Sequence, residues 1–151
     1  MHSVIVHYHE IALKGGNRPW FIARLVRNLR VLTADLGVTN VRTLMGRIEL
    51  ELDPAAEWEP LRERLRGVFG VANFAQAGRV SGVDPDEVAA AVLADLDGRS
   101  PGTFRVSARR ADKRHPLTSP QIEREVGGRI KQAKGWAVDL SAPDLTVRLE
   151  M

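Results

Sequence analysis

The sequence predicts an α+β protein built from two domains. Up to about residue 80, segments with strand and helix periodicity follow one another in the order β-α-β-β-α-β. A short linker containing Ser, Gly and Pro then leads into a second series of helices and strands. A chain of 151 residues suits one ordinary domain or two very small ones, and its 44% of apolar residues suffices for a buried core.

The first four elements follow from the spacing of their apolar residues. Ser3–Tyr8 is rich in Val and Ile and alternates weakly, which predicts a strand. From Trp20 to Leu36, apolar residues recur at helical spacing, and Gly37 is expected to end that helix. Residues 39–44 and 47–52 are predicted to form two strands.

A second helix and a closing strand complete the first domain, residues 1–80. The closing strand is expected over residues 72–80. The stripe that predicts the helix consists of Trp58, Leu61, Leu65, Val68 and Phe69. The resulting order is the split pattern of a ferredoxin-like fold, in which two helices cover one face of an antiparallel sheet.

The second domain, residues 81–151, is predicted to be α/β and begins with the linker 81–85. A helical stripe spans residues 88–96. Alternation predicts a half-buried strand over residues 104–109 and a final strand over residues 145–151.

Composition excludes several classes of function. The chain contains no cysteine, which excludes a disulfide framework, a thiolate zinc site, a cysteine nucleophile and a persulfide carried on this chain. No segment reaches transmembrane length and no signal peptide is present, so we expect a cytoplasmic protein with no membrane partner. The 22 Lys and Arg against 19 Asp and Glu leave a net charge of only +3, so the distribution of the cations matters more than their number. Most are Arg, which suits phosphate oxygens, although a GC-rich genome explains that bias as well.

The first predicted helix has a basic outer face. Arg24 and Arg27 lie away from its apolar stripe, and no acidic residue accompanies them before Asp35. A solvated helix face usually mixes both signs. One interpretation is a phosphate-contacting face that continues into Lys14 and Arg18 of the preceding turn; an ordinary solvated face is the other.

A denser basic cluster lies between residues 105 and 115. It comprises Arg105, Arg109, Arg110, Lys113 and Arg114. The first two share one face of a strand, Arg110 points to the other, and the last two fall in the loop before a helix. That helix is expected to begin at Thr118 or Ser119, with a hydroxyl cap and Gln121 as capping-box partner. Its free N–H groups would form an anion site, so strand, loop and helix start together predict a cradle for a nucleic-acid backbone.

No catalytic or metal site is predicted. His7 and His9 share a strand face without a third ligand, and the glycines of residues 14–18 lack the spacing of a nucleotide-binding loop. Trp20, Trp58 and Trp136 fall at helical or core-like positions. We therefore expect no exposed stacking platform, and recognition of RNA by shape and backbone.

Two separated motifs resemble those of the tRNA 4-thiouridine sulfurtransferases, also called thiamine-biosynthesis sulfur transferases. The first is Tyr-His-Glu-Ile-Ala-Leu-Lys-Gly-Gly-Asn-Arg at residues 8–18. The second, residues 104–120 together with Asp-Leu-Thr-Val at 144–147, is similar to a THUMP domain. The resemblance implies a ferredoxin-like domain and a THUMP domain that binds the tRNA acceptor end. It also implies an enzyme that activates a uridine with ATP and then delivers sulfur from a persulfide relay.

The resemblance further implies which residues contact RNA. They are Lys14 and Arg18 in the first motif, and Arg105, Arg109, Arg110, Lys113, Arg114, Thr118 and Ser119 in the second. It implies no catalytic residue and no cofactor on this chain, with ATP bound only by a catalytic pyrophosphatase-type domain or subunit.

Two features depart from the family pattern. His9 stands where the family usually has Gly, and the sequence ends at Met151, before another THUMP strand and the catalytic domain. We therefore expect either a fragment or a partner of a separate catalytic subunit. The strand 145–151 would then lack a neighbour, and a homodimer could cover that edge.

The function predicted from these features is a tRNA-binding module that positions the acceptor end for thiolation. Three alternatives stay open: a non-catalytic scaffold subunit that uses the exposed edge strand, a THUMP module for another tRNA modification such as methylation, and an acylphosphatase-like hydrolase on the same fold. The first motif argues against the second alternative. The third lacks a visible phosphate-binding loop near the first strand.

Overall fold

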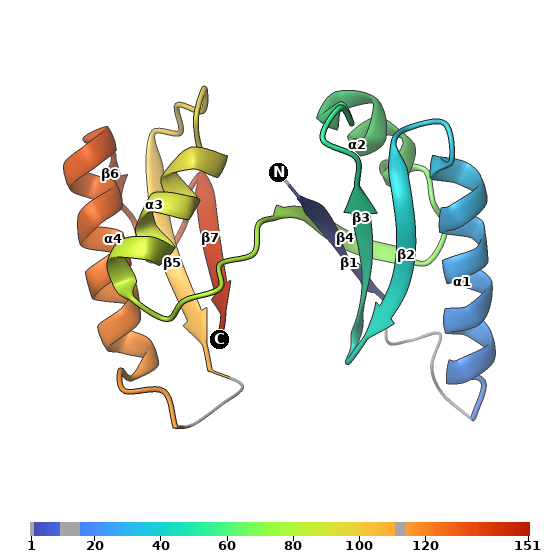
Figure 1. Ribbon diagram of the computed structural model, residues 1–151, viewed down its shortest axis with the longest axis horizontal. Helices are drawn as coiled ribbons and strands as arrows, with labels where there is room; N and C mark the ends of the chain where they lie inside the picture. The colour runs from blue at the N-terminus through green and yellow to red at the C-terminus, as the bar shows by residue number, and fades with distance from the viewer. Residues whose placement is uncertain (1, 10–15, 111–113) are drawn as a thin grey trace. The chain divides into compact units, whose positions relative to one another are not determined.

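The computed structural model describes residues 2–9, 16–110 and 114–151. The chain divides into two compact units, Met1–Gly78 and Arg79–Met151, which are treated separately below (Figure 1). The predicted α+β class and the β-α-β-β-α-β order of the first unit are confirmed. No helix in the described part of the chain combines the length and the apolar character that a bilayer crossing requires.

The first unit is a four-stranded antiparallel sheet with two helices. Its elements are β1 (Ser3–Tyr8), α1 (Arg18–Thr33), β2 (Val38–Leu44), β3 (Arg47–Leu52), α2 (Trp58–Arg66) and β4 (Val71–Ala77). The strand order is β2-β3-β1-β4, as expected for the β-α-β-β-α-β pattern.

The core of the first unit lies between the helices and one face of the sheet. In β1, Val4 pairs with Leu50 of β3 and Val6 with Ile48, and all four are fully buried. Both helices bury leucines against this layer: Leu25 and Leu29 from α1, Leu61 and Leu65 from α2. Alternation in the strands and helical spacing in α1 and α2 therefore converge on one apolar layer.

Two details of the first unit differ from the sequence-based expectation. Helix α1 ends at Thr33, whose hydroxyl donates a hydrogen bond to the Leu29 carbonyl at 2.7 Å. Gly37, with a φ of +74°, serves the turn into β2, where a Cβ would lie 2.9 Å from the Cβ of Ala56. Phe69 was expected in the α2 stripe, but α2 ends at Arg66 and the Phe69 side chain is 91% exposed.

The second unit packs two helices against a three-stranded parallel sheet. Its elements are α3 (Pro85–Asp95), β5 (Thr103–Arg109), α4 (Ser119–Lys134), β6 (Ala137–Val138) and β7 (Leu145–Glu150). The strand order is β6-β5-β7. Phe104 and Val106 of β5 pack with Val88 of α3 and with Ile122 and Val126 of α4.

Strand β7 lies at an edge of this sheet. Its residues pair with β5 from Phe104–Leu145 to Arg109–Glu150, and no other described strand pairs with it. The edge expected from the sequence is therefore present in the described part of the chain. A row of unpaired backbone groups at such an edge is a site for pairing with another strand.

Candidate nucleic-acid interface

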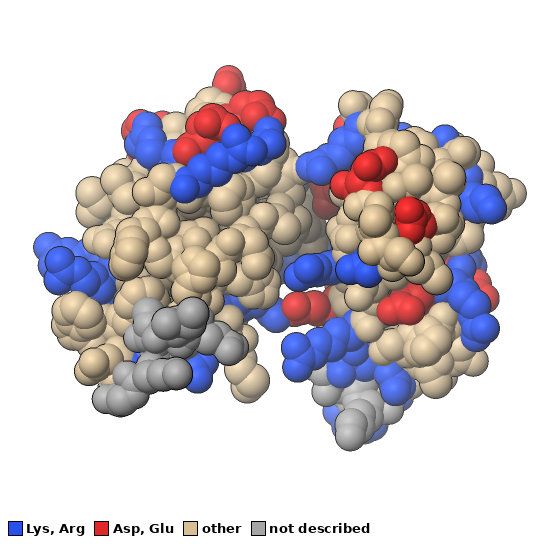
Figure 2. All heavy atoms as spheres, turned by 180° about the vertical axis from the view of Figure 1, so that it is seen from behind, with Lys and Arg blue, Asp and Glu red and all other residues tan. Residues whose placement is uncertain are grey.

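The outer face of α1 carries exposed arginines and no acid. Arg18, Arg24 and Arg27 are exposed, and the sequence of the helix contains no Asp or Glu. No acidic side chain in the described part of the chain forms an ion pair with any of these three. Figure 2 shows Lys and Arg atoms at the outer edge of this unit, where α1 lies, without acidic atoms beside them. Lys14, expected to continue this face, lies outside the described residues.

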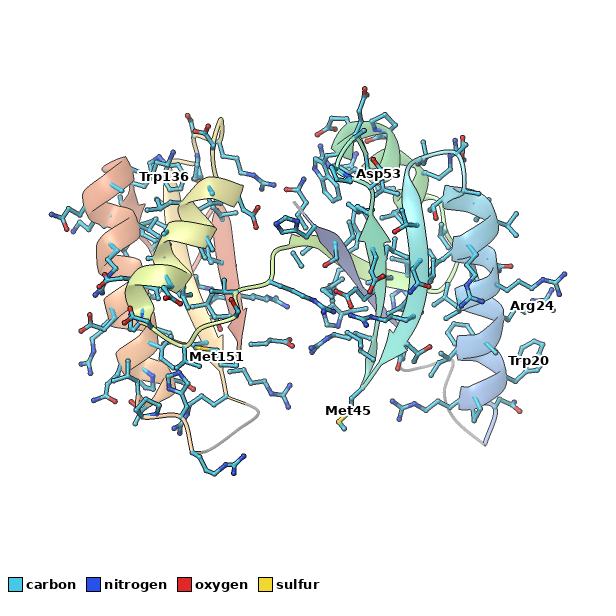
Figure 3. The ribbon with its side chains drawn as sticks, viewed as in Figure 1. Trp20, Arg24, Met45, Asp53, Trp136 and Met151 are labelled. Carbon is cyan, nitrogen blue, oxygen red and sulfur yellow. The ribbon has the colours of Figure 1, made fainter. Side chains whose placement is uncertain are left out.

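Trp20 belongs to the same outer face. Its side chain is 64% exposed, and the Arg24 guanidinium carbon lies 5.4 Å from the centroid of its ring. Figure 3 shows both side chains projecting from α1 away from the sheet. Trp20 was expected at a helical or core-like position; it lies on a helix, as expected, but outside the core. Helical spacing alone predicts this exposure, because Trp20 shares a helix face with Arg24 and Arg27 and not with the buried Leu25.

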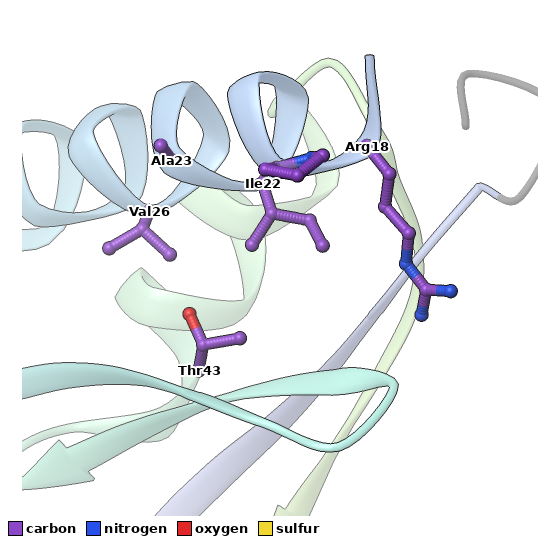
Figure 4. A pocket seen from close by; sticks show the side chains of 6 residues that line it. Arg18, Ile22, Ala23, Val26 and Thr43 are labelled. Carbon is purple, nitrogen blue, oxygen red and sulfur yellow. The ribbon is translucent and has the colours of Figure 1, made fainter. Parts of the chain in front are cut away.

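A shallow groove runs along the inner flank of the first half of α1. It is lined by Arg18, Pro19, Ile22, Ala23, Val26 and Thr43. Figure 4 shows Ile22 and Val26 of α1 facing Thr43 of β2 across the groove, with the Arg18 guanidinium at one end. The groove is thus largely apolar, with the Arg18 guanidinium at one end.

The open face of the sheet in the second unit presents a second set of arginines. Phe104 and Val106 point into the core, so the alternating residues Arg105, Ser107 and Arg109 lie on the face away from α3 and α4. The parallel register places Arg148 of β7 next to Ser107.

The members of this set differ in what they contact. Arg105 is held against its own unit, because Nε donates to the Thr146 hydroxyl at 3.3 Å and Nη1 to the Leu140 carbonyl at 3.1 Å. Arg109 and Arg148 are exposed, and the side chain of neither forms a hydrogen bond or an ion pair with another described residue. Sequence reasoning missed Arg148, although it falls in the polar phase of the predicted final strand. On this face, the guanidinium groups of Arg109 and Arg148 are therefore available to bind an external anion.

The loop before α4 is braced from within. Nη1 of Arg110 donates to the Leu117 carbonyl at 3.2 Å, and the Leu117 N–H donates to Nδ1 of His115 at 3.0 Å. Arg110 therefore shapes the loop, and its contact with an RNA phosphate stays a prediction. Arg114 is exposed, and Lys113 lies outside the described residues.

The start of α4 offers fewer free donors than expected. Thr118 caps the helix: its hydroxyl accepts from the Gln121 N–H, and the Gln121 side chain accepts from the Thr118 N–H. Pro120 has no N–H, so the N–H of Ser119 is what the first turn still presents. The predicted capping box is confirmed. It occupies the N–H groups of Thr118 and Gln121, which the expected anion site would have needed as donors. Thr118 and Ser119 as RNA contacts stay predictions.

Several described arginines outside these two faces are matched by acids. On α2, Arg62 pairs with Glu59 at 3.0 Å and Arg66 with Glu63 at 2.7 Å. The side-chain hydrogen bond from Arg64 holds the pKa of Asp35 below its ordinary value.

Acids also neutralise the basic residue at the junction of α3 and α4. Arg129 pairs with Asp86 and with Glu125, and the hydrogen bond from Arg129 lowers the pKa of Asp86. The same hydrogen bond, together with the one that Arg129 donates to Glu125, raises the pKa of Arg129. Among the described residues, exposed and unmatched arginines therefore concentrate on α1 and on the β5–β7 face, with Arg124 of α4 as a further one.

Comparison with known proteins identifies both units. Residues 3–75 match the family model of the ThiI ferredoxin-like domain, and residues 86–151 match that of the THUMP domain. The chain belongs to the ThiI ferredoxin-like and THUMP domain families. The resemblance to the N-terminal region of the tRNA sulfurtransferases is thereby confirmed, and the two units are called the ferredoxin-like unit and the THUMP unit below.

Curated relatives extend over both units. A probable tRNA sulfurtransferase from Moorella thermoacetica is 35% identical over 150 residues, which cover 99% of this chain and 38% of the relative. One from Thermus thermophilus is 37% identical over 140 residues, covering 91% of this chain and 33% of the relative. The chain thus spans less than two fifths of the length of these relatives.

Solved structures match this chain over both units. The crystal structure of a 4-thiouridine synthetase–RNA complex with bound ATP matches 99% of this chain and 38% of that chain, with a TM-score of 0.80 and 31% identity. TrmN from Thermus thermophilus matches 99% of this chain and 42% of that chain, with a TM-score of 0.64 and 25% identity.

Proposed function

We propose that this chain is a tRNA-binding module that positions the acceptor end of a tRNA for 4-thiouridine formation. The observation that carries the proposal is the concentration of unmatched arginines on α1 and on the open β5–β7 face, in a chain matched over both units by a 4-thiouridine synthetase solved with RNA. Arginine without an acidic partner is suited to phosphate oxygens, which it can bind with two parallel hydrogen bonds.

The chemistry itself is assigned to a domain outside the given sequence. Relatives named tRNA sulfurtransferase are more than twice as long as this chain, and one solved structure contains ATP. In this proposal the ATP-dependent sulfur transfer takes place on that catalytic domain, in the cytoplasm, while the present chain supplies no catalytic residue and no cofactor. The β7 edge is then covered by a further strand, by the catalytic partner or by a second copy of the chain.

A salt-dependent binding assay tests the proposal. The chain is titrated with total tRNA and with a DNA duplex of equal charge at two salt concentrations. Because phosphate contacts release counterions, the affinity for tRNA is expected to fall steeply with salt. The test variant is Arg109→Gln with Arg148→Gln. It should weaken tRNA binding at least about tenfold and reduce the slope of log affinity against log salt by roughly one per arginine.

A charge-matched control separates a specific surface from net charge. Arg62→Gln with Arg66→Gln removes the same two charges from α2, where both arginines are paired with glutamates. This control should bind tRNA like the parent. Equal losses in both variants, or no preference for tRNA over DNA, would contradict the proposal and favour a scaffold subunit that binds through the β7 edge.

A second candidate is a THUMP module that serves a different tRNA modification. The similarity to TrmN favours it. The match of residues 3–75 to the ThiI ferredoxin-like model favours thiolation instead. Complementation of a strain that lacks 4-thiouridine, with the module fused to a sulfurtransferase catalytic domain, distinguishes the two.

A further inference from the structure

The pair formed by Trp20 and Arg24 has no evident role in the stability of the ferredoxin-like unit. Trp20 is absent from the core and 64% exposed, and no described aromatic ring packs against it. Single exposed apolar residues are common on protein surfaces. Trp20 differs from such residues because a guanidinium lies 5.4 Å from its ring centroid and because it stands in a row of unmatched cations.

We propose that Trp20 is a stacking platform for an unpaired nucleobase of the bound RNA, with Arg18, Arg24 and Arg27 on the flanking phosphates. This inference rests on the proposed function, since it takes RNA as the ligand. It adds a contact of a different chemical kind, on the ferredoxin-like unit and separate from the arginines of the β5–β7 face.

The geometry of α1 fits a short single-stranded segment. Trp20, Arg24 and Arg27 recur at intervals of four and three residues, so they form one stripe along the helix. Trp20 and Arg27 are seven residues apart, which corresponds to about 10 Å along the helix axis. A base on the indole ring therefore leaves its neighbouring phosphates within reach of the long arginine side chains on either side.

The charge of this face selects RNA over a protein partner. The helix has no acidic residue, and its first turn lacks both an acid and a side-chain cap. A protein surface docking here would bring its own balanced charges against three cations, whereas a polyanion neutralises all of them. Stacking on an aromatic ring also tolerates any base, since every base has a π-face, so the platform needs no base-specific hydrogen bonds.

Two probes of equal phosphate number test the platform. One is a single-stranded oligoadenylate and the other is a blunt RNA duplex, which has no unpaired base. Trp20→Ala should weaken binding of the single strand about 5- to 100-fold and leave duplex binding unchanged. It should also remove the quenching of tryptophan fluorescence that the single strand causes in the parent. Trp20→Phe keeps an aromatic ring and should retain most of the affinity.

The matched control is Val31→Ala, which truncates another exposed apolar side chain of α1, 69% exposed. It should bind both probes like the parent. Thermal unfolding of each variant verifies that the ferredoxin-like unit is intact, as expected for exposed side chains.

The outcomes separate this inference from the proposed function. If Trp20→Ala binds the single strand as well as the parent does, while Arg109→Gln with Arg148→Gln still loses tRNA, the platform is overturned and the tRNA-binding function stands. Trp20 would then be open to a protein partner. If the parent binds neither probe nor tRNA, both proposals fail.

Discussion

The substitution Thr118→Ala tests whether the Thr118 hydroxyl at the start of α4 caps the helix or contacts RNA. In the structure the Thr118 hydroxyl accepts a hydrogen bond from the Gln121 N–H at 3.4 Å, and the Gln121 side chain accepts one from the Thr118 N–H at 2.8 Å. The alanine variant loses the first of these bonds. It keeps the second, because that donor is a backbone group.

The expected loss of stability follows from this geometry. Removing a Thr cap costs about 0.5–2 kcal/mol. The 3.4 Å bond is longer than the usual range for N–H donors, so the lower half of that interval, about 0.5–1 kcal/mol, is expected. In a domain of this size such a loss lowers the melting temperature by about 2–8 °C.

Thermal unfolding followed by circular dichroism measures the effect, with Thr118→Ser as the variant that keeps a hydroxyl. Affinity for tRNA is measured well below the transition, where both variants are folded. Because the hydroxyl is occupied by its own helix, Thr118→Ala should change tRNA affinity by less than about twofold. An unchanged melting temperature together with a tenfold loss of tRNA affinity would refute the interpretation of Thr118 as a helix cap and establish it as an RNA contact.

Two further predictions concern stability. Asp86→Asn should flatten the acid side of the stability profile below about pH 5, measured by urea unfolding. The hydrogen bond from Arg129 lowers the pKa of Asp86, so its contribution is present above the ordinary value of 3.8 and is lost as the pH falls through the lowered pKa. Gly70→Ala should destabilise more than Gly46→Ala: both have a positive φ, but a Cβ at Gly70 would lie 2.8 Å from Cζ of Phe21, while none is near at Gly46. Equal unfolding free energies for the two alanine variants would contradict this account.

Periodicity predicted most of the fold because the core is built from regular elements. The alternating valines of β1 and the leucines of α1 fall where spacing alone places them. Strand β6 was missed, since two residues, Ala137–Val138, are too short to show any period. The end of α1 was misplaced, because Gly37 resembles a helix-ending glycine but serves the following turn.

The candidate site was predicted less completely, because partners in space cannot be read from spacing. The sequence identified Arg105 and Arg110 as cations, but not that each donates to a backbone carbonyl of its own unit. Arg148 could be assigned to the site only from the parallel register of β5 and β7, which places it beside Ser107. The exposure of Trp20, in contrast, could have been predicted from the sequence. The helical periodicity that places Arg24 on the exposed face of α1 places Trp20 on the same face.

The location of the acids defines the candidate interface better than the number of cations does. A net charge of +3 predicts little affinity for a polyanion. At physiological ionic strength, however, charges interact over only about 8 Å, so each surface acts largely by its local balance. Acids neutralise the arginines of α2 and Arg129 of α4, and they are absent from the whole of α1. A nearly neutral protein can therefore carry strongly basic faces, and the variants that test them must be matched in net charge and differ only in whether the removed arginine has an acidic partner.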